Sequence, residues 1–184
     1  MIIGITGTLG AGKTTVAEYL VSQGFTYRSV RSFIIEEVHR RNIPVNRDTL
    51  VSVGNEIRAA HGGDYIIKTL IAEVTVSGSD VVIESIRAIP EATLLLAEGG
   101  VLVAVDADVK VRYERIIETK SQVVPVSFQA FTEQEAREMH SSDTAKQSIA
   151  DVMALATFSV VNSGSEVELH QEIDRILSSS RETN

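Results

Sequence analysis

The residues with the clearest chemical signal lie near the start of the chain, where residues 7–14 read GTLGAGKT and a second threonine follows. Glycines at positions 7, 10 and 12 let a loop close so that its backbone N–H groups point inward, where they bind anions. The lysine adds a positive charge, and the threonine after it adds an oxygen ligand for a metal ion. The spacing G-x-x-x-x-G-K-[ST] is the pattern of loops that bind nucleotide phosphates.

Each residue of this loop has an expected role at the nucleotide. Lys13 is expected to reach the β- and γ-phosphates, and the Thr14 hydroxyl is expected to bind Mg²⁺, so ATP and Mg²⁺ are the predicted cofactors. The residues predicted to contact the nucleotide are Gly7, Thr8, Leu9, Gly10, Ala11, Gly12, Lys13, Thr14 and Thr15. The glycine spacing does not fit G-x-G-x-x-G, which argues against a dinucleotide-binding fold.

Charged residues later in the chain suggest what is done with the phosphate. Glu84 ends the apolar run of residues 80–85 and is expected to orient a metal-bound water, and Arg87 follows it by three positions. Arg112 and Arg115 lie one turn apart on a predicted helix, where they are placed to neutralise charge on a transferred phosphoryl group. The chain has no Asn-Lys-x-Asp motif, so a GTPase is disfavoured and a small-molecule kinase is favoured.

The elements that must position these residues alternate between strands and helices. Continuous apolar runs predict strands that are covered on both faces, as in a parallel sheet. The predicted strands are 1–6, 25–30, 80–85, 101–107 and 157–162, and the predicted helices are 13–22, 31–41, 47–60, 64–76, 89–98, 108–119, 132–147 and 165–178. This alternation predicts a three-layer α/β/α P-loop NTPase fold with a five-stranded parallel sheet, whose ligands bind at the carboxyl ends of the strands.

Two segments interrupt the alternation within a single predicted domain of residues 1–184. Residues 31–76 place several helices between the second and third strands, and we interpret them as a helical insertion that binds the acceptor. Residues 119–131 resemble a loop between two helices, and we interpret them as a short lid that excludes water from the reaction.

The composition narrows the class of protein further. The 184 residues carry a net charge of −8 and no cysteine, which argues against a nucleic-acid partner, disulfides and cysteine-bound zinc. No apolar run approaches the length of a membrane span. A cytoplasmic, soluble monomer or homodimer that acts on a small-molecule nucleotide is therefore expected.

The order of several segments resembles the nucleoside monophosphate kinase family, particularly its adenylate-kinase-like branch, and also dephospho-CoA kinase. The segments are GTLGAGKTT (7–15), YRSVRSFIIEEVHRRNIP (27–44), NEIRAAHG (55–62), ESIR (84–87), VDADVKVRYERI (105–116) and FSVVNSGSEVELHQEI (158–173). The resemblance implies ATP- and Mg²⁺-dependent phosphoryl transfer to a nucleoside or deoxynucleoside monophosphate. It also implies that Arg87, together with Arg58, holds the acceptor phosphate. The family's further acceptor arginine falls on Ile35 here. Arg31 lies one turn earlier on the same helical face, and we expect it to substitute for that arginine.

Two other functions stay open. Dephospho-CoA kinase transfers to a sugar hydroxyl, and that chemistry needs a carboxylate base near the acceptor, whereas residues 28–33, RSVRSF, contain none. The other is a nucleotide-binding regulatory protein or a slow ATPase, which the irregular placement of the acceptor arginines favours.

Overall fold

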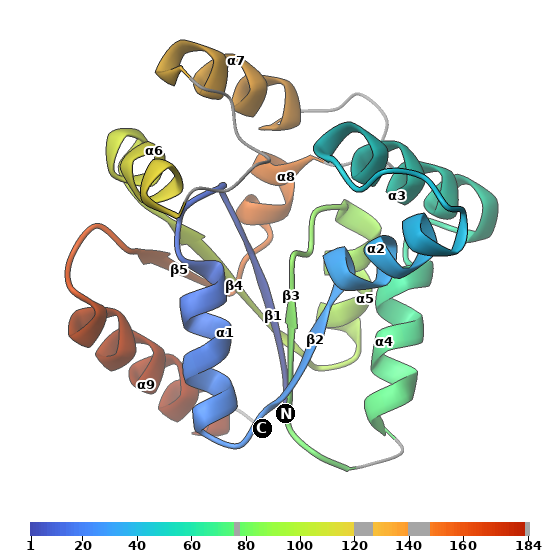
Figure 1. The fold of residues 1–184 in the computed structure, drawn as a ribbon. Coiled ribbons are helices and arrows are strands. Elements are labelled where there is room, and N and C mark those ends of the chain that lie inside the picture. The colour runs from blue at the N-terminus through green and yellow to red at the C-terminus, as the bar shows by residue number, and fades with distance from the viewer. Residues whose placement is uncertain (76–77, 120–126, 140–147, 183–184) are drawn as a thin grey trace.

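The fold is a parallel sheet between two layers of helices, seen in a computed structural model that describes residues 1–75, 78–119, 127–139 and 148–182 (Figure 1). The strands are β1 (Ile2–Gly7), β2 (Thr26–Ser29), β3 (Val81–Glu84), β4 (Val101–Asp106) and β5 (Phe158–Val161). All neighbouring strands run parallel, in the order β2-β3-β1-β4-β5. The predicted three-layer α/β/α fold with a five-stranded parallel sheet is confirmed.

The helices alternate with the strands except in two regions. They are α1 (Lys13–Ser22), α2 (Val30–Arg40), α3 (Arg47–His61), α4 (Tyr65–Thr75), α5 (Ile89–Ala97), α6 (Val109–Glu118), α7 (Phe128–Met139), α8 (Ile149–Ala154) and α9 (Glu166–Glu182). Most agree within a few residues with the helices predicted from the sequence. Helices α2, α3 and α4 occupy the segment 31–76 between β2 and β3, as predicted.

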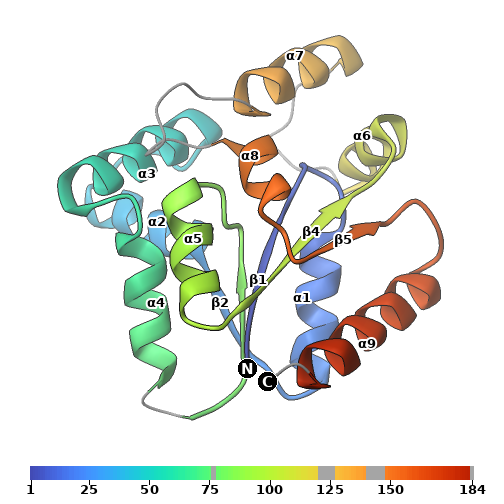
Figure 2. The same ribbon diagram turned by 180° about the vertical axis from the view of Figure 1, so that it is seen from behind.

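The sheet divides the core because alternate residues of a strand point to opposite faces. Ile3 and Ile5 of β1 pack with α1 and α9, whereas Val81 and Ile83 of β3 pack with α4, α5 and α8. Figure 1 shows α1 and α9 in front of the sheet, and Figure 2 shows α5 and α8 on its other face. Both faces are therefore covered, which accounts for the continuous apolar runs.

The second half of the chain differs from prediction in its helices. The predicted helix 132–147 is wrong in its start, because α7 begins at Phe128, whereas residues 140–147 of that prediction lie outside the described residues. The short helix α8 was not predicted. Ser127 caps α7: its hydroxyl accepts a hydrogen bond from the N–H of Ala130 at 3.2 Å. Of the predicted lid loop 119–131, residues 120–126 lie outside the described residues and 128–131 are helical rather than loop.

The carboxyl ends of the strands bring distant residues together at one edge of the sheet. Ser29 of β2 lies beside Glu84 of β3 in register, and Glu84 lies beside Ile5 of β1. Helices α1, α2 and α6 begin near this edge, where Figure 1 shows it at the top of the sheet. None of the helices within the described ranges is both long and apolar enough to cross a membrane.

Candidate active site

The phosphate-binding loop needs its glycines for conformation and for space. Gly10 and Gly12 have φ angles of +80° and +92°, a region that side chains with a Cβ rarely adopt. A Cβ on Gly12 would lie 2.3 Å from Nδ2 of Asn162, and one on Gly10 would lie 2.6 Å from the carbonyl oxygen of Arg112. The loop therefore packs against two other segments too closely for any other residue.

Lys13 is folded back over the loop that precedes it. Its Nζ donates hydrogen bonds to the carbonyl oxygens of Gly7 at 3.0 Å and Thr8 at 2.6 Å, and the residue is 8% exposed. Burial, followed by the charge of Arg87, lowers the pKa of Lys13 to about 7, although Glu84 opposes this shift. A bound phosphate would favour the ammonium form, because a nearby anion raises the pKa of a lysine.

Side chains from other strands hold the loop in shape. The Thr8 hydroxyl donates to Oδ1 of Asp106, at the end of β4, at 2.6 Å. Nδ2 of Asn162, directly after β5, donates to the carbonyl oxygen of Ala11 at 2.8 Å. The loop is therefore fixed by tertiary contacts as well as by its own backbone.

Next to Lys13, a buried carboxylate lies between two hydroxyl groups. Glu84 is 7% exposed, and its Oε1 accepts a hydrogen bond from Oγ1 of Thr14 at 3.2 Å. Its Oε2 accepts one from the hydroxyl of Tyr27 at 2.6 Å. Burial, together with this bond to Glu84, raises the pKa of Tyr27 to about 12, so its phenol keeps its proton near neutral pH.

The Thr14–Glu84 pair fits Mg²⁺ that arrives with a nucleotide. Mg²⁺ prefers oxygen ligands and usually takes one or two from the protein, with waters and substrate phosphates completing its shell. The described part of the chain has no group of three or more histidine or acidic side chains able to hold a metal alone. A hydroxyl and a carboxylate beside the phosphate loop suit a metal shared with phosphates.

A cleft of about 580 Å³ lies over this edge of the sheet. Its lining residues include Leu9, Gly10, Gly12, Lys13, Thr14, Thr15, Tyr27, Ser29, Arg31, Ser32, Ile35, Glu84, Ser85, Arg87, Arg115 and Glu118. The cleft thus brings together most of the predicted nucleotide-contacting residues with two of the three predicted acceptor arginines. Gly7, Thr8 and Ala11 lie behind this surface and support the loop.

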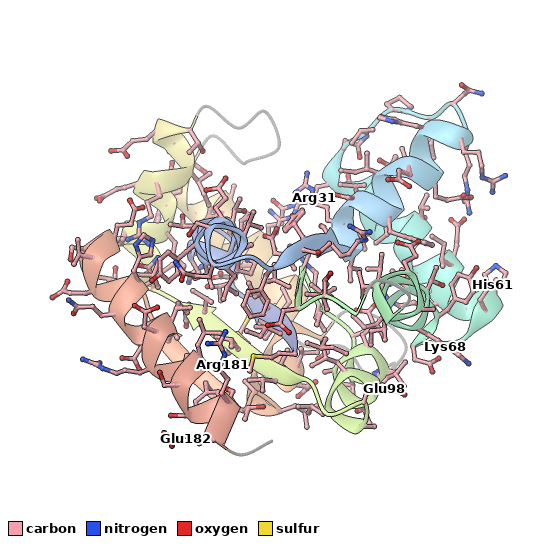
Figure 3. The ribbon with its side chains drawn as sticks, turned by 90° about the horizontal axis from the view of Figure 1, so that it is seen from below. Arg31, His61, Lys68, Glu98, Arg181 and Glu182 are labelled. Carbon is pink, nitrogen blue, oxygen red and sulfur yellow. The ribbon has the colours of Figure 1, made fainter. Side chains whose placement is uncertain are left out.

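Arg31 and Arg87 reach the cleft from separate elements. Arg31 lies in the first turn of α2 and lines the cleft with Ile35, one turn later. Figure 3 labels Arg31 at the start of α2, on the side that faces α1. The backbone of Arg87 is fixed on both sides: its N–H donates to Oε2 of Glu91 at 3.2 Å, and its carbonyl accepts from the N–H of Ser148 at 2.9 Å.

Arg58, the third predicted acceptor arginine, lies away from the cleft lining. Its Nε and Nη2 donate to Oε1 of Glu91 at 2.9 and 2.7 Å, and both side chains are 0% exposed. The other carboxylate oxygen of Glu91 accepts from the N–H groups of Arg87 and Ala88. Arg58 is therefore part of a buried ion pair that supports the Arg87 backbone, and as placed it does not reach an acceptor.

The two arginines of the predicted pair, Arg112 and Arg115, also have different surroundings in the structure. Arg115 lines the cleft, and its Nη1 donates to the carbonyl oxygen of Asn162 at 2.9 Å. Arg112 is 5% exposed; it donates to the carbonyl oxygens of Ala107 and Leu9 and forms an ion pair with Glu135 of α7. Arg112 fastens the phosphate loop to α6 and α7, so only Arg115 faces the cleft.

Some residues of the site were not found from the sequence. Tyr27 lies in a short strand, where an aromatic residue is commonplace. No feature of the neighbouring sequence indicated that its hydroxyl bonds to Glu84. Asn162 lies in the segment 158–173, which carries part of the family resemblance, but the sequence did not show that its side chain holds the phosphate loop. Glu91 lies in the first turn of α5, where an acidic residue is expected as a cap. Nothing in the sequence therefore indicated that Glu91 forms a buried ion pair with Arg58.

Known proteins resemble this chain in sequence and in fold. A family model described as an AAA domain matches residues 3–124. A UPF0200 protein of Pyrobaculum aerophilum is 30% identical over 179 residues, which cover 96% of each chain. The chain belongs to the UPF0200 family. A second UPF0200 protein, from Thermococcus kodakarensis, is 25% identical over 184 residues, which again cover 96% of each chain.

Solved structures share the fold of this UPF0200 protein at low sequence identity. Shikimate kinase from Acinetobacter baumannii has a TM-score of 0.59 at 17% identity, with 97% of this chain and 93% of that chain covered. The protein TT1252 from Thermus thermophilus has a TM-score of 0.63 at 20% identity, with 97% of both chains covered. The P-loop kinase fold is confirmed, while membership of the nucleoside monophosphate kinase branch stays a prediction.

Proposed function

We propose that this UPF0200 protein is a kinase that transfers the γ-phosphoryl group of ATP, in the presence of Mg²⁺, to a nucleoside or deoxynucleoside monophosphate. The observation that carries the proposal is one cleft lined by Lys13 and by the two arginines Arg31 and Arg87. A kinase for a phosphorylated acceptor must hold two anionic groups next to each other. Arginine suits the second group because its planar fork binds phosphate through paired hydrogen bonds.

Each cation has a role that follows from its position. Lys13 and the loop N–H groups hold the β- and γ-phosphates, while Arg31 and Arg87 hold the acceptor phosphate. Mg²⁺ bound at Thr14 and Glu84 would supply positive charge to the β- and γ-phosphates. Arg115, which also lines the cleft, neutralises charge on the transferred group in this proposal. An acceptor phosphate is already anionic, so positioning and charge stabilisation account for the catalysis without a protein base.

A second candidate is transfer to a hydroxyl acceptor such as dephospho-CoA or a small polyol. The observation that favours it is Glu84, whose Oε2 already accepts a hydrogen bond from a hydroxyl, that of Tyr27, in this cleft. If a substrate hydroxyl donated a hydrogen bond to Glu84 in the same way, the carboxylate could take the proton of that hydroxyl. A shikimate kinase with the same fold makes a hydroxyl acceptor a natural comparison.

A coupled ADP-release assay over a panel of acceptors separates these functions. The panel contains ribonucleoside and deoxynucleoside monophosphates, dephospho-CoA and shikimate, each with ATP and Mg²⁺. We expect one or a few monophosphates to accelerate ADP release, with an equal amount of nucleoside diphosphate formed. Acceleration only by a hydroxyl acceptor would establish the second candidate instead. Tight ATP binding without acceleration by any acceptor would overturn both and indicate a regulatory protein or slow ATPase.

A further inference from the structure

The carboxylate of Glu84 is oriented from two sides by groups on different elements. Thr14, in the first turn of α1, contacts Oε1, and Tyr27, in β2, contacts Oε2. The last torsion of a glutamate side chain has only a broad preference, so a carboxylate without partners turns easily. A bond to one oxygen therefore fixes the direction in which the other oxygen points.

The bond from Tyr27 is the better defined of the two. Its length of 2.6 Å is that expected for a hydroxyl donating to an ionised carboxylate, whereas the Thr14 contact is 3.2 Å. Tyr27 comes from a strand that is paired with β3, the strand of Glu84. Tyr27 and Glu84 are thus held at a fixed separation by the sheet, while Thr14 contacts Glu84 from the loop side.

From this arrangement we propose that Tyr27 is a positioning residue for the magnesium site. By holding Oε2 of Glu84, Tyr27 keeps Oε1 beside the Thr14 hydroxyl, and these two oxygens would hold the metal that arrives with the nucleotide. The proposal rests on the proposed use of Mg²⁺-ATP, but it does not depend on which acceptor is used. Partners that orient the groups around a metal typically contribute 10–100-fold in metal affinity.

The chain offers a matched control for this role. The hydroxyl of Tyr19 donates to Oδ1 of Asp174 at 2.7 Å, a bond of nearly the same length on the solvent-exposed side of α1. Tyr19 does not line the cleft. Tyr19→Phe therefore removes a comparable tyrosine–carboxylate bond at a place where no metal is proposed.

The experiment measures ATP binding by calorimetry as a function of Mg²⁺ concentration, with no acceptor present. We expect Tyr27→Phe to raise the half-saturating Mg²⁺ concentration about 10-fold or more, while ATP binding in the absence of divalent metal stays at the wild-type value. Tyr19→Phe should match the wild type in both measurements. Thermal unfolding of each variant reports whether the fold is kept.

A double substitution decides whether Tyr27 acts through Glu84. In a Glu84→Gln background, Tyr27→Phe should add little to the loss of Mg²⁺ affinity, because the oriented carboxylate is already gone. Additive losses would overturn the proposal, and so would a Tyr27→Phe variant with wild-type Mg²⁺ dependence. Equal losses with and without Mg²⁺ would also overturn it, since Tyr27 would then act on the nucleotide or the fold. The acceptor panel tests the proposed function separately, so the two failures are distinguishable.

Discussion

The donor and acceptor sides of the cleft differ in how far apart in the chain their residues lie. On the donor side, Lys13 contacts the carbonyl oxygens of Gly7 and Thr8, six and five residues before it. On the acceptor side, Arg31 comes from the start of α2, and Arg87 from the loop after β3. The anion-binding groups of the donor side thus come from one local motif, which Asp106 and Asn162 support from outside. The acceptor side, in contrast, forms only when the sheet and the helical insertion come together.

The difference is clearest for the arginines. Arg31, Arg58 and Arg87 have the same chemistry, and the sequence predicts the same role for all three. In the structure Arg31 and Arg87 line the cleft, while Arg58 is fully buried against Glu91. Burial and neighbouring charges, rather than residue type, decide which arginine lines the cleft.

The largest expected effect tests the donor side. Lys13→Ala removes the only lysine in the cleft lining among the described residues, together with charge that would stabilise the transferred group. We expect acceptor-dependent ADP release to fall by at least about 10²-fold. Lys68→Ala, at an exposed lysine of α4 labelled in Figure 3, is the control and should keep wild-type turnover. Near-normal turnover in Lys13→Ala would contradict the assignment of the donor site.

The next effect tests whether Arg58 has a structural role. Arg58→Met leaves the carboxylate of Glu91 buried without its cation, and breaking a buried ion pair in this way costs about 3–5 kcal/mol. We expect a loss of that size in the free energy of unfolding, measured in urea. Arg40→Ala is the control, because the Arg40–Glu37 pair is solvent-exposed and such pairs contribute little. Unchanged stability with a raised KM for the acceptor would instead restore the direct role predicted from the sequence.

The same contrast explains how much the sequence could reveal. The fold and the phosphate loop were predictable because apolar periodicity and the G-x-x-x-x-G-K-[ST] spacing are local properties of the chain. The partners of Arg58 and Arg112 were not, since Glu91 and Glu135 are far away in the chain and come close to these arginines only in the folded structure. Arg112 and Arg115 share a helix face in the sequence, but only tertiary neighbours separate their roles.

A smaller effect tests the acceptor side directly. Arg31→Ala removes one proposed charged contact to the acceptor phosphate, and such hydrogen bonds contribute about 1.5–3 kcal/mol. We expect the KM for the acceptor found in the panel to rise about 10-fold or more, with the KM for ATP unchanged. Arg40→Ala on the same helix serves again as the control. A rise in the KM for ATP of equal size would assign Arg31 to the donor side instead.

The last prediction uses pH, because the cations on the two sides titrate differently. Burial lowers the pKa of Lys13 to about 7 from its usual 10.5, whereas arginine stays charged throughout this range. Between these two values the unfolded chain holds a proton on Lys13 that the ligand-free folded protein has lost. Raising the pH through this window therefore favours the ligand-free folded state.

ATP binding should show the opposite trend, because the phosphates bind the ammonium form of Lys13. Above about pH 7 the lysine must take up a proton on binding, so ATP affinity should fall by up to about tenfold for each pH unit. Calorimetry in buffers of different ionisation enthalpy measures this proton uptake directly between about pH 7.5 and about pH 9. In Lys13→Met the affinity should be weaker and independent of pH over that range. Proton uptake that persists in Lys13→Met would show that another group takes up the proton, and would contradict the prediction that Lys13 is neutral above about pH 7 in the ligand-free protein.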